Sequence, residues 1–244
     1  MKDRILLFIP MYNCEKQIVR VLGQLDSEIQ EYISEVIVVN NRSTDDGEAA
    51  VTRFVEERDM KIPVNLLRNK ENYGLGGSHK VAFAYAVTHG FDYFVVLHGD
   101  DQGHIKNLLP YLKNGAYRKY DCFLGARFKK GAQLEGYSRF RTFGNIVYNT
   151  LFTIGTGRMI NDLGSGLNMY NVEIFKDKHY LKYADNLAFN VCLLLGSCYY
   201  KHKMMFFPIK WSEDDQVSNV KMVSQAIDIL GMLGAYVVNK KKFA

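Results

Sequence analysis

Cysteine is scarce in this sequence of 244 residues, which has four cysteines, at positions 14, 122, 192 and 198. No two of them form a CxxC pair, and their spacing matches no zinc site. Each lies in or beside an apolar run, so we expect buried free thiols in a reducing cytoplasm.

Long apolar runs are also absent. The longest candidate, residues 226–238, contains Asp228 and two glycines, and it is shorter than the roughly 20 apolar residues that a membrane-spanning helix needs. The apolar part of the N-terminal segment MKDRILLFIPMYN is too short for a signal peptide. These absences predict a soluble or peripheral protein, located in the cytoplasm or at the inner face of a membrane.

A strong excess of charge is the third absence. The net charge is +5, and the basic residues are scattered except for Lys129-Lys130 and the tail Lys240-Lys241-Lys242. This excess is too small to indicate nucleic acid as a partner, but it suits an anionic small substrate or an acidic membrane surface. With 48% apolar and 23% charged residues, the chain can bury a sizeable core.

Apolar runs alternate with amphipathic patterns through the first half of the chain. Four short runs predict buried strands over residues 5–9, 36–39, 64–67 and 93–97, and helical spacing predicts helices over 15–25, 49–58 and 75–87. Uninterrupted apolar strands that alternate with helices are typical of a mostly parallel sheet with helices on both faces. The predicted fold class is therefore three-layer α/β/α.

The second half is less regular. It predicts strands over residues 121–126 and 205–209, helices over 143–154, 187–195 and 225–238, and a polar, mobile loop over 128–141. Neither a linker composition nor a repeat divides the chain, so we predict one domain over residues 1–244.

Polar clusters follow three of the predicted strands, at residues 10–13, 40–45 and 98–102. The carboxyl ends of parallel strands meet at one edge of a sheet, where α/β proteins bind their ligands. The clusters therefore predict a binding site at that edge.

The last of these clusters places two adjacent carboxylates, Asp100 and Asp101, directly after an apolar strand. Carboxylates in this position suit Mg²⁺ or Mn²⁺, which prefers oxygen ligands and usually shares phosphate oxygens with a substrate. The alternative is a surface turn in which an aspartate caps the following helix. The predicted sheet topology favours the functional interpretation.

Six motifs follow one another along the chain: IPMYNCE (9–15), VIVVNNRSTDD (36–46), NKENYGLGGSHKVAFAYA (69–86), LHGDDQ (97–102), DCFLGARF (121–128) and DLGSGL (162–167). In this order they resemble glycosyltransferase family 2, with its GT-A (Rossmann-like) fold, and within it the polyprenyl-phosphate glycosyltransferases. The resemblance implies inverting transfer of a sugar from a UDP- or GDP-linked donor, assisted by Mn²⁺ or Mg²⁺. It also implies that residues 1–120 bind the nucleotide and residues 121–244 bind the acceptor and complete catalysis.

The resemblance assigns roles to residues after the first two strands. Pro10, Tyr12 and Asn13 would flank the nucleotide. Asn40 stands where the family usually has an aspartate that contacts the base or ribose. Asp45 would be the last acid of that segment, with helix capping as an equal alternative.

The resemblance also implies a metal site after the fourth strand. Asp100 would bind the cation that bridges the donor diphosphate, with Gln102 in support and Gly99 beside the nucleotide. The first aspartate of the family motif is His98 here. His98 is either a ligand, which suits Mn²⁺ better than Mg²⁺, or a hydrogen-bonding neighbour. Asp101 is an extra acid that either adds a ligand or caps a helix.

Two arginines of the second half match arginines that contact phosphate groups in the polyprenyl-phosphate enzymes. They are Arg127 and Arg141. A guanidinium fork could steady both the diphosphate and an acceptor phosphate. The alternative for each arginine is a surface ion pair.

The acid that the family usually carries in its second half falls at Asn190, and a neutral amide cannot act as a general base. A sugar hydroxyl normally needs such a base, whereas a lipid phosphate is already an anion. The substitution thus favours a polyprenyl phosphate at a membrane surface as the acceptor. Asp162 is the alternative base, or a turn residue before Gly164.

Three further segments have two interpretations each. NYGLGGSHK lacks the spacing of a P-loop. It predicts close packing at a helix start in preference to a phosphate-binding loop. Ser218, Asn219 and Lys221 could close on the donor or form a plain surface loop. An apolar stripe on the last predicted helix comprises Ile227, Leu230, Leu233 and Val237. We interpret it as packing into the core, with docking on a membrane as the alternative.

The leading hypothesis is therefore an inverting glycosyltransferase with a lipid-phosphate acceptor. A glycan or polysaccharide hydroxyl is the alternative acceptor. An inactive subunit that only binds a nucleotide sugar is a second alternative, suggested by His98 and Asn190. A nucleotidyltransferase is disfavoured, because no G-x-G-T-R loop follows the first strand. The sugar and base depend on pocket shape, which a few contacts decide.

Overall fold

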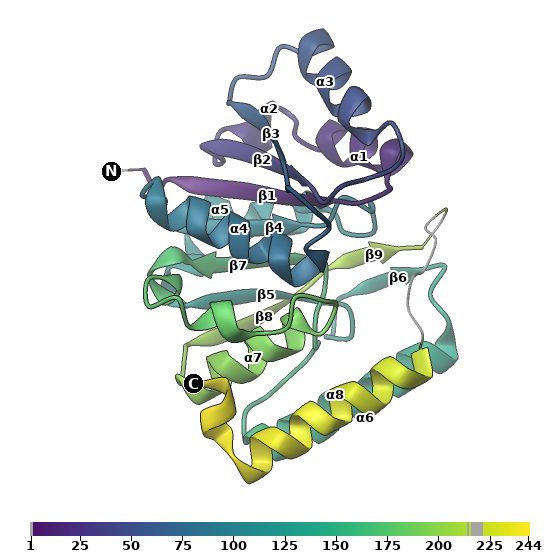
Figure 1. Ribbon diagram of the computed structural model, residues 1–244, viewed down its shortest axis with the longest axis vertical. Helices are drawn as coiled ribbons and strands as arrows, with labels where there is room; N and C mark the ends of the chain where they lie inside the picture. The colour runs from purple at the N-terminus through teal and green to yellow at the C-terminus, as the bar shows by residue number, and fades with distance from the viewer. Residues whose placement is uncertain (1, 214, 216–221) are drawn as a thin grey trace.

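A seven-stranded sheet forms the centre of the computed structural model, which describes residues 2–213, 215 and 222–244 (Figure 1). The strand order is β3-β2-β1-β4-β7-β5-β8; β7 is antiparallel to both neighbours, and the other neighbours are parallel. The strands are β1 Ile5–Met11, β2 Glu35–Asn40, β3 Val64–Arg68, β4 Tyr93–Leu97, β5 Cys122–Ala126, β7 Leu167–Asn171 and β8 Met204–Pro208. A separate parallel pair consists of β6 Gln133–Glu135 and β9 Lys210–Ser212.

The central position of β1 follows from its apolar composition. Leu6 and Phe8 lie in the core on one face of the sheet, and Leu7 and Ile9 lie in the core on the other face. A strand with apolar side chains on both faces is stable only when helices cover both. The predicted mostly parallel, three-layer α/β fold is confirmed.

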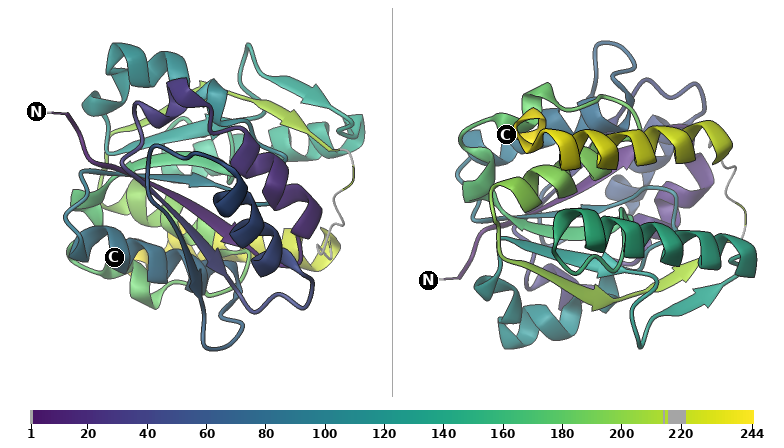
Figure 2. Two further views of the ribbon diagram at one scale, coloured as in Figure 1. Left: turned by 90° about the horizontal axis from the view of Figure 1, so that it is seen from above. Right: turned by 90° about the horizontal axis from the view of Figure 1, so that it is seen from below.

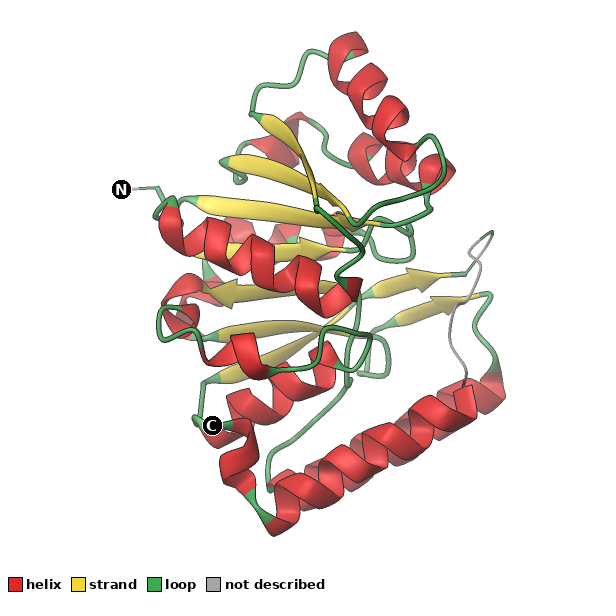
Figure 3. Ribbon diagram, viewed as in Figure 1, coloured by secondary structure: helices red, strands yellow, loops and turns green. Residues whose placement is uncertain are grey.

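Helices cover the two faces of the sheet (Figure 3). α1, α2, α3 and α5 contribute to the core that contains Leu7, and α4 and α7 contribute to the core that contains Phe8. The helices are α1 Glu15–Gly23, α2 Ser27–Gln30, α3 Gly47–Glu57, α4 Gly74–Thr88, α5 Leu109–Asn114, α6 Arg139–Thr156, α7 Phe189–Tyr199 and α8 Met222–Val238. Short 3-10 helices are η1 Ile105–Asn107, η2 Ala116–Lys119, η3 Val172–Phe175, η4 His179–Lys182 and η5 Lys240–Phe243.

The glycines at the start of α4 allow close packing. A Cβ at Gly76 would lie 2.3 Å from the carbonyl oxygen of Ala184. Gly76 N instead donates to the carbonyl oxygen of Asp185 at 2.6 Å. The prediction of close packing at this helix start is confirmed.

α6 and α8 run side by side in the same direction along the outside of the second half (Figures 1 and 2). A Cβ at Gly155 in α6 would lie 2.7 Å from Leu233 Cδ1 in α8, so the two helices touch closely at this end. Leu233 is buried, but Ile227, Leu230 and Val237 are exposed. The prediction that this stripe packs into the core is wrong for these three residues, because α8 turns its Leu233 side inward.

The predicted mobile loop over residues 128–141 is also wrong, because it contains β6 and the start of α6. β6 pairs with β9, with Leu134 opposite Trp211. A strand of three residues whose partner lies so far along the chain has no local periodicity to reveal it. In the described part of the chain, no helix has the length and apolar character to cross a membrane.

Candidate functional site

The ends of β1, β2 and β4 meet at one edge of the sheet. Gly99 N donates to the carbonyl oxygen of Pro10 at 3.2 Å, and Asn41 N donates to that of Met11 at 2.9 Å. A Cβ at Gly99 would lie 2.7 Å from the Pro10 oxygen, so glycine is needed for this close approach. The structure thus brings together the residues predicted after the first and fourth strands, with Tyr12 exposed among them.

Asn13 and Asp45 link the loops that follow β1 and β2. Asn13 Oδ1 accepts a hydrogen bond from Thr44 N at 2.8 Å. Asp45 accepts from Glu15 N at 2.8 Å and from Gly47 N at 3.2 Å. Asp45 therefore satisfies main-chain donors at the starts of α1 and α3, as the capping alternative anticipated. Its contact with a nucleotide stays a prediction, as does that of Asn13.

Asn40 is turned into the protein. Its side chain is buried, its Nδ2 donates to Glu48 Oε1 at 2.5 Å, and its Oδ1 accepts from Ser43 N at 2.8 Å. Both ends of the amide are thus engaged within the loop after β2. The arrangement holds this loop in shape, whereas the contact with base or ribose implied by the family stays a prediction.

A network of asparagine amides next to Asn40, of which Asn41 and Asn69 are buried, escaped the sequence analysis. Asn41 Oδ1 accepts from Asn69 Nδ2 at 2.9 Å and from Tyr73 N at 2.8 Å, and its Nδ2 donates to Asn72 Oδ1 at 2.7 Å. Asn69 also donates to Ser78 Oγ at 3.0 Å. The network fixes the end of β2 to the start of α4. Its only signal in the sequence is the recurrence of asparagine after the second and third strands.

Asp100 follows β4 and is partly buried. Its Oδ1 accepts from Gln102 N at 3.3 Å. Burial raises the pKa of Asp100 to about 6, against the opposing effects of the Gln102 N–H and the charge of Arg127. A carboxylate that pays a desolvation cost in this way is stabilised by a bound cation. The main chain of Gln102 is held in place, because its main-chain carbonyl oxygen accepts a hydrogen bond from Ser212 N at 3.0 Å.

His98 stands two residues before Asp100 and is partly buried, with its Nε2 atom shielded from solvent. Its main-chain N donates to the carbonyl oxygen of Gly166 at 2.9 Å, and a Cβ at Gly166 would lie 3.0 Å from the His98 Cβ. Burial, and then the charge of Arg127, lower the pKa of His98 to about 4, so the ring is neutral at pH 7. The buried Nε2 has no hydrogen-bond partner among the described residues. A neutral nitrogen without such a partner is compatible with either role predicted for His98.

Asp101 is bound to α1. Its backbone has the left-handed φ of 60°. Its Oδ2 accepts from Arg20 Nε at 2.6 Å, and its Oδ1 accepts from Gln24 Nε2 at 2.9 Å. The second carboxylate of the cluster thus holds the loop to α1, a contact that no sequence pattern indicated; its role as a metal ligand stays a prediction.

Arg127 and Asp162 form an enclosed ion pair. Arg127 Nε and its main-chain N both donate to Asp162 Oδ2 at 2.9 Å, and Nη2 donates to Oδ1 at 2.8 Å and to the Gly164 carbonyl oxygen at 3.1 Å. The guanidinium lies over the Trp211 ring at 4.9 Å. Burial acts to lower the pKa of Arg127, but the charge and hydrogen bonds of Asp162 outweigh it and raise that pKa. Two predicted site residues are therefore partners of each other.

Arg141 lies on the first turn of α6 and pairs with Glu213. Its Nη1 donates to Glu213 Oε2 at 2.6 Å. Its guanidinium lies 4.3 Å from the Tyr137 ring centre, and that of Arg127 lies 6.0 Å from the same centre. Tyr137 therefore connects the two predicted phosphate-binding arginines. The structure shows an ion pair for each of them.

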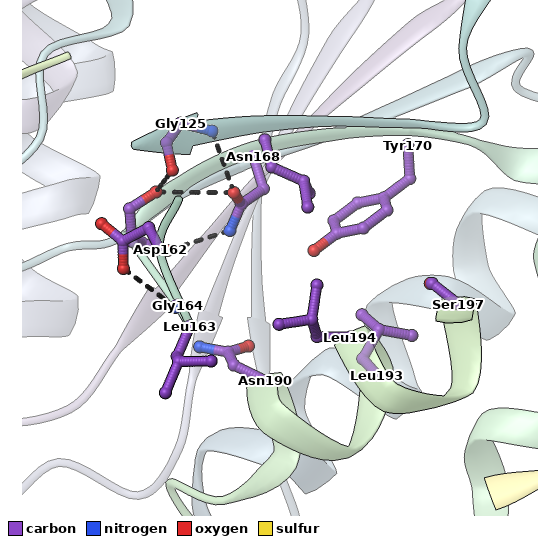
Figure 4. Close-up of a pocket in the computed structure, with 12 residues that line it drawn as sticks. Gly125, Asp162, Leu163, Gly164, Asn168, Tyr170, Asn190, Leu193, Leu194 and Ser197 are labelled. Atoms are coloured by element: carbon purple, nitrogen blue, oxygen red, sulfur yellow. Dashed lines mark hydrogen bonds between the residues drawn. The ribbon is translucent and has the colours of Figure 1, made fainter. Parts of the chain in front are cut away.

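The Gly-Ser-Gly turn after Asp162 borders a cavity of about 20 Å³, enough for one water molecule (Figure 4). Asn190 reaches this turn from α7, and a Cβ at Gly164 would lie 3.1 Å from the Asn190 Cβ. Asp162 is the one carboxylate among the described residues that line the cavity. Ser218, Asn219 and Lys221, predicted to close on the donor or form a surface loop, lie outside the described residues.

The seven-stranded, mostly parallel sheet with helices on both faces corresponds to the GT-A fold. Two of the similar solved structures illustrate it. The glucosyl-3-phosphoglycerate synthase of Mycobacterium tuberculosis, in complex with UDP, superposes with a TM-score of 0.68 at 14% identity over 97% of this chain and 80% of that protein. A mannosyltransferase of Pyrobaculum calidifontis, in complex with GDP-Man and Mn²⁺, gives a TM-score of 0.61 at 16% identity over 100% and 72%.

Comparison of the sequence with known families identifies the family. The family model described as Glycosyl transferase family 2 matches residues 7–178, and the chain belongs to this family of glycosyltransferases. A dolichol-phosphate mannosyltransferase of Pyrococcus furiosus is 27% identical over 143 residues, which are 57% of this chain and 37% of that protein. The chain thus spans well under half the length of this relative.

Proposed function

We propose that the chain transfers a sugar with inversion from a UDP- or GDP-linked donor to a polyprenyl phosphate at a membrane surface, with one divalent cation, Mn²⁺ or Mg²⁺, at Asp100. The observation that carries this proposal is a partly buried carboxylate, with its pKa raised to about 6, at the meeting point of the β1 and β4 ends. A bound cation would supply positive charge to the diphosphate that leaves the sugar. The GDP-Man and Mn²⁺ complex of the similar mannosyltransferase supports this choice of ligands.

The possible metal ligands around Asp100 suit a cation that binds together with the nucleotide. Within the described residues, no group of three or more His, Cys, Asp and Glu side chains could hold a metal. Mg²⁺ is commonly held by one or two carboxylates together with substrate phosphates and water. Asp100, with His98 or Gln102 beside it, matches that arrangement. We therefore expect strong cation binding only when a diphosphate is also present.

The proposal of a phosphate acceptor rests on the residues at the two positions considered for a general base, Asp162 and Asn190. Both oxygens of Asp162 accept hydrogen bonds from Arg127, and Asn190 is neutral. A hydroxyl acceptor must lose a proton as it attacks, whereas a phosphate oxygen attacks as an anion. These residues therefore support a phosphate acceptor over a glycan hydroxyl.

The arginines would position phosphate groups. The bonds to Asp162 and Gly164 use Nε and Nη2 of Arg127, and none of them uses Nη1. Nη1 is the group with which we expect Arg127 to reach a phosphate oxygen. Arg141 would act beside it, from the other side of Tyr137, after exchanging Glu213 for the phosphate.

A thermal-shift panel tests the donor site. UDP, GDP, CDP and CMP are each added with Mn²⁺, Mg²⁺ or EDTA. We expect one diphosphate to raise the melting temperature with a cation and not with EDTA; at a hundredfold excess over Kd the stabilisation is about 2.7 kcal/mol. Asp100→Ala should abolish the cation dependence.

A transfer assay then tests the acceptor. With the nucleotide sugar that the panel selects, sugar transfer to a short polyprenyl phosphate is compared with transfer to the matching polyprenol. Turnover with the phosphate alone supports the proposal. Equal turnover with hydroxyl acceptors would favour the glycan alternative, and donor binding without turnover on any acceptor would favour the inactive subunit.

A further inference from the structure

The outer surface of α6 carries a continuous row of exposed apolar side chains. Spaced as on one face of a helix, its members are Phe140, Phe143, Val147, Leu151 and Ile154, all exposed. Phe143 is 67% and Ile154 is 74% exposed. Soluble proteins rarely leave so extended an apolar surface without a partner.

α8 extends this surface. It lies beside α6, as the view from below in Figure 2 shows, and it exposes Ile227, Leu230 and Val237. The sequences of the two helices contain three charged residues: Arg139 and Arg141 at the start of α6, and Asp228 in α8. The α6–α8 face, defined here as the exposed apolar side chains of both helices, is thus nearly free of charge along its length.

A basic cleft lies where both helices end. It has a volume of about 560 Å³ and is lined by Arg158, Lys201 and Lys240 together with Thr156, Cys198, Tyr199 and Tyr236. Among the described residues, no acid lines it. Arg158 is fixed by donating to the main-chain oxygens of Ser197 and His202, at 3.5 and 2.7 Å.

The charges of this cleft are not neutralised within the described part of the chain. None of its three cations forms an ion pair there. Lys240 lies over the Tyr236 ring at 5.5 Å, and Lys241 and Lys242 follow it on the exposed end of the chain. An apolar face that ends in unpaired cations matches a bilayer, whose acyl region is apolar and whose headgroups are anionic.

We propose that the α6–α8 face lies on a membrane that contains anionic lipid, and that the cleft between Arg158, Lys201 and Lys240 binds a lipid headgroup phosphate. The inference rests on the proposed function in one respect, that the acceptor is reached at a membrane surface. The first turn of α6 carries Arg141 beside Tyr137. Docking of this helix would therefore place the membrane next to the arginines proposed to bind the acceptor phosphate.

Vesicle co-sedimentation of the full chain tests the apolar part. Vesicles of phosphatidylcholine with phosphatidylglycerol should bind the protein, and phosphatidylcholine alone should bind it more weakly. Phe143→Ser and Ile154→Ser should each weaken binding more than about tenfold. Val147→Ser and Val19→Ser form a matched pair, because the two valines are 39% and 38% exposed and Val19 lies on α1; the first should weaken binding and the second should not.

A second set of variants tests the basic cleft. Lys201→Gln and Lys240→Gln should each reduce affinity for the anionic vesicles about fivefold, and 0.5 M salt should reduce it in the wild type. Lys61→Gln, on the loop before β3, is the control and should change nothing. Unchanged binding by both cleft variants would overturn the headgroup site.

A second copy of the chain is the competing occupant of the α6–α8 face. Sedimentation velocity without lipid decides it: a dimer that Ile154→Ser dissociates, together with no vesicle binding, would overturn the membrane assignment. The nucleotide thermal shift is measured on every variant. Vesicle binding without any nucleotide shift would refute the proposed function and leave this inference standing. A nucleotide shift without vesicle binding would refute this inference and leave the proposed donor site standing.

Discussion

The enclosed pair of Arg127 and Asp162 gives the sharpest test of the structure. Replacing Asp162 by Leu removes the acceptor of three Arg127 hydrogen bonds and leaves a buried guanidinium without its counter-charge. The two side chains are 13% and 1% exposed, so water cannot take over these bonds without opening the site. Breaking a buried pair in this way costs about 3–5 kcal/mol.

The expected signal is large. For a chain of this size, each kcal/mol shifts the melting temperature by about 2–4 °C, so Asp162→Leu should lower it by roughly 6–20 °C. Urea unfolding monitored by circular dichroism gives the free energy directly. The double variant Arg127→Met/Asp162→Leu should recover much of the loss, because it removes both charges together.

Arg141 and Glu213 provide the matched control. This pair is 36% and 20% exposed, and water screens it. Arg141→Ala should therefore cost only about 0.2–1 kcal/mol. If Asp162→Leu costs no more than Arg141→Ala, or if the double variant loses the sum of its single variants, the assignment of a buried, coupled pair is refuted.

Three further outcomes follow from the site. Because the pKa of Asp100 is raised, the contribution of this group to the free energy of unfolding is complete below about pH 4 and is lost as pH rises through about 6. Without metal, Asp100→Asn should therefore have a higher melting temperature than the wild type at pH 8 but not at pH 4. An equal difference at both pH values would contradict the raised pKa. Asn41→Ala should cost about 1–3 kcal/mol in urea unfolding, since it removes the acceptor of the Tyr73 main-chain N and one of the two acceptors of Asn69 Nδ2; a loss within error would rule out the network. Gly99→Ala should weaken nucleotide binding in the thermal-shift assay, because its Cβ would meet the Pro10 oxygen at 2.7 Å; unchanged affinity would show that this approach is not needed.

The residue pattern predicted the longer buried strands and most of the helices, but not β6, β7 or β9; a binding site at the carboxyl ends of the strands stays a prediction. Buried strands such as β1 and β4 could be predicted because their apolar runs are local and short. Asp100 could be proposed as a metal ligand because it follows such a strand directly, and that role stays a prediction. These features depend on nearest neighbours in the sequence and on the general rule for strand ends.

Side-chain partners could not be predicted in this way. Asp101 and Asp100 are adjacent, but a left-handed backbone at Asp101 sends its carboxylate to α1. Asp162 meets Arg127 across 35 residues because β7 inserts beside β5. The stripe on α8 had the period of a core helix, and periodicity does not say whether an apolar face meets the core or the outside.

The position of β7 also determines when the sheet can close. β4 has β1 on one side, and its other edge is covered only when Leu167–Asn171 has been synthesised. During synthesis, Tyr93–Leu97 therefore remains an open apolar edge strand while more than seventy further residues emerge. A fragment that stops at residue 120 would keep that edge permanently, so we expect it to self-associate even though it carries most of the predicted nucleotide-binding residues.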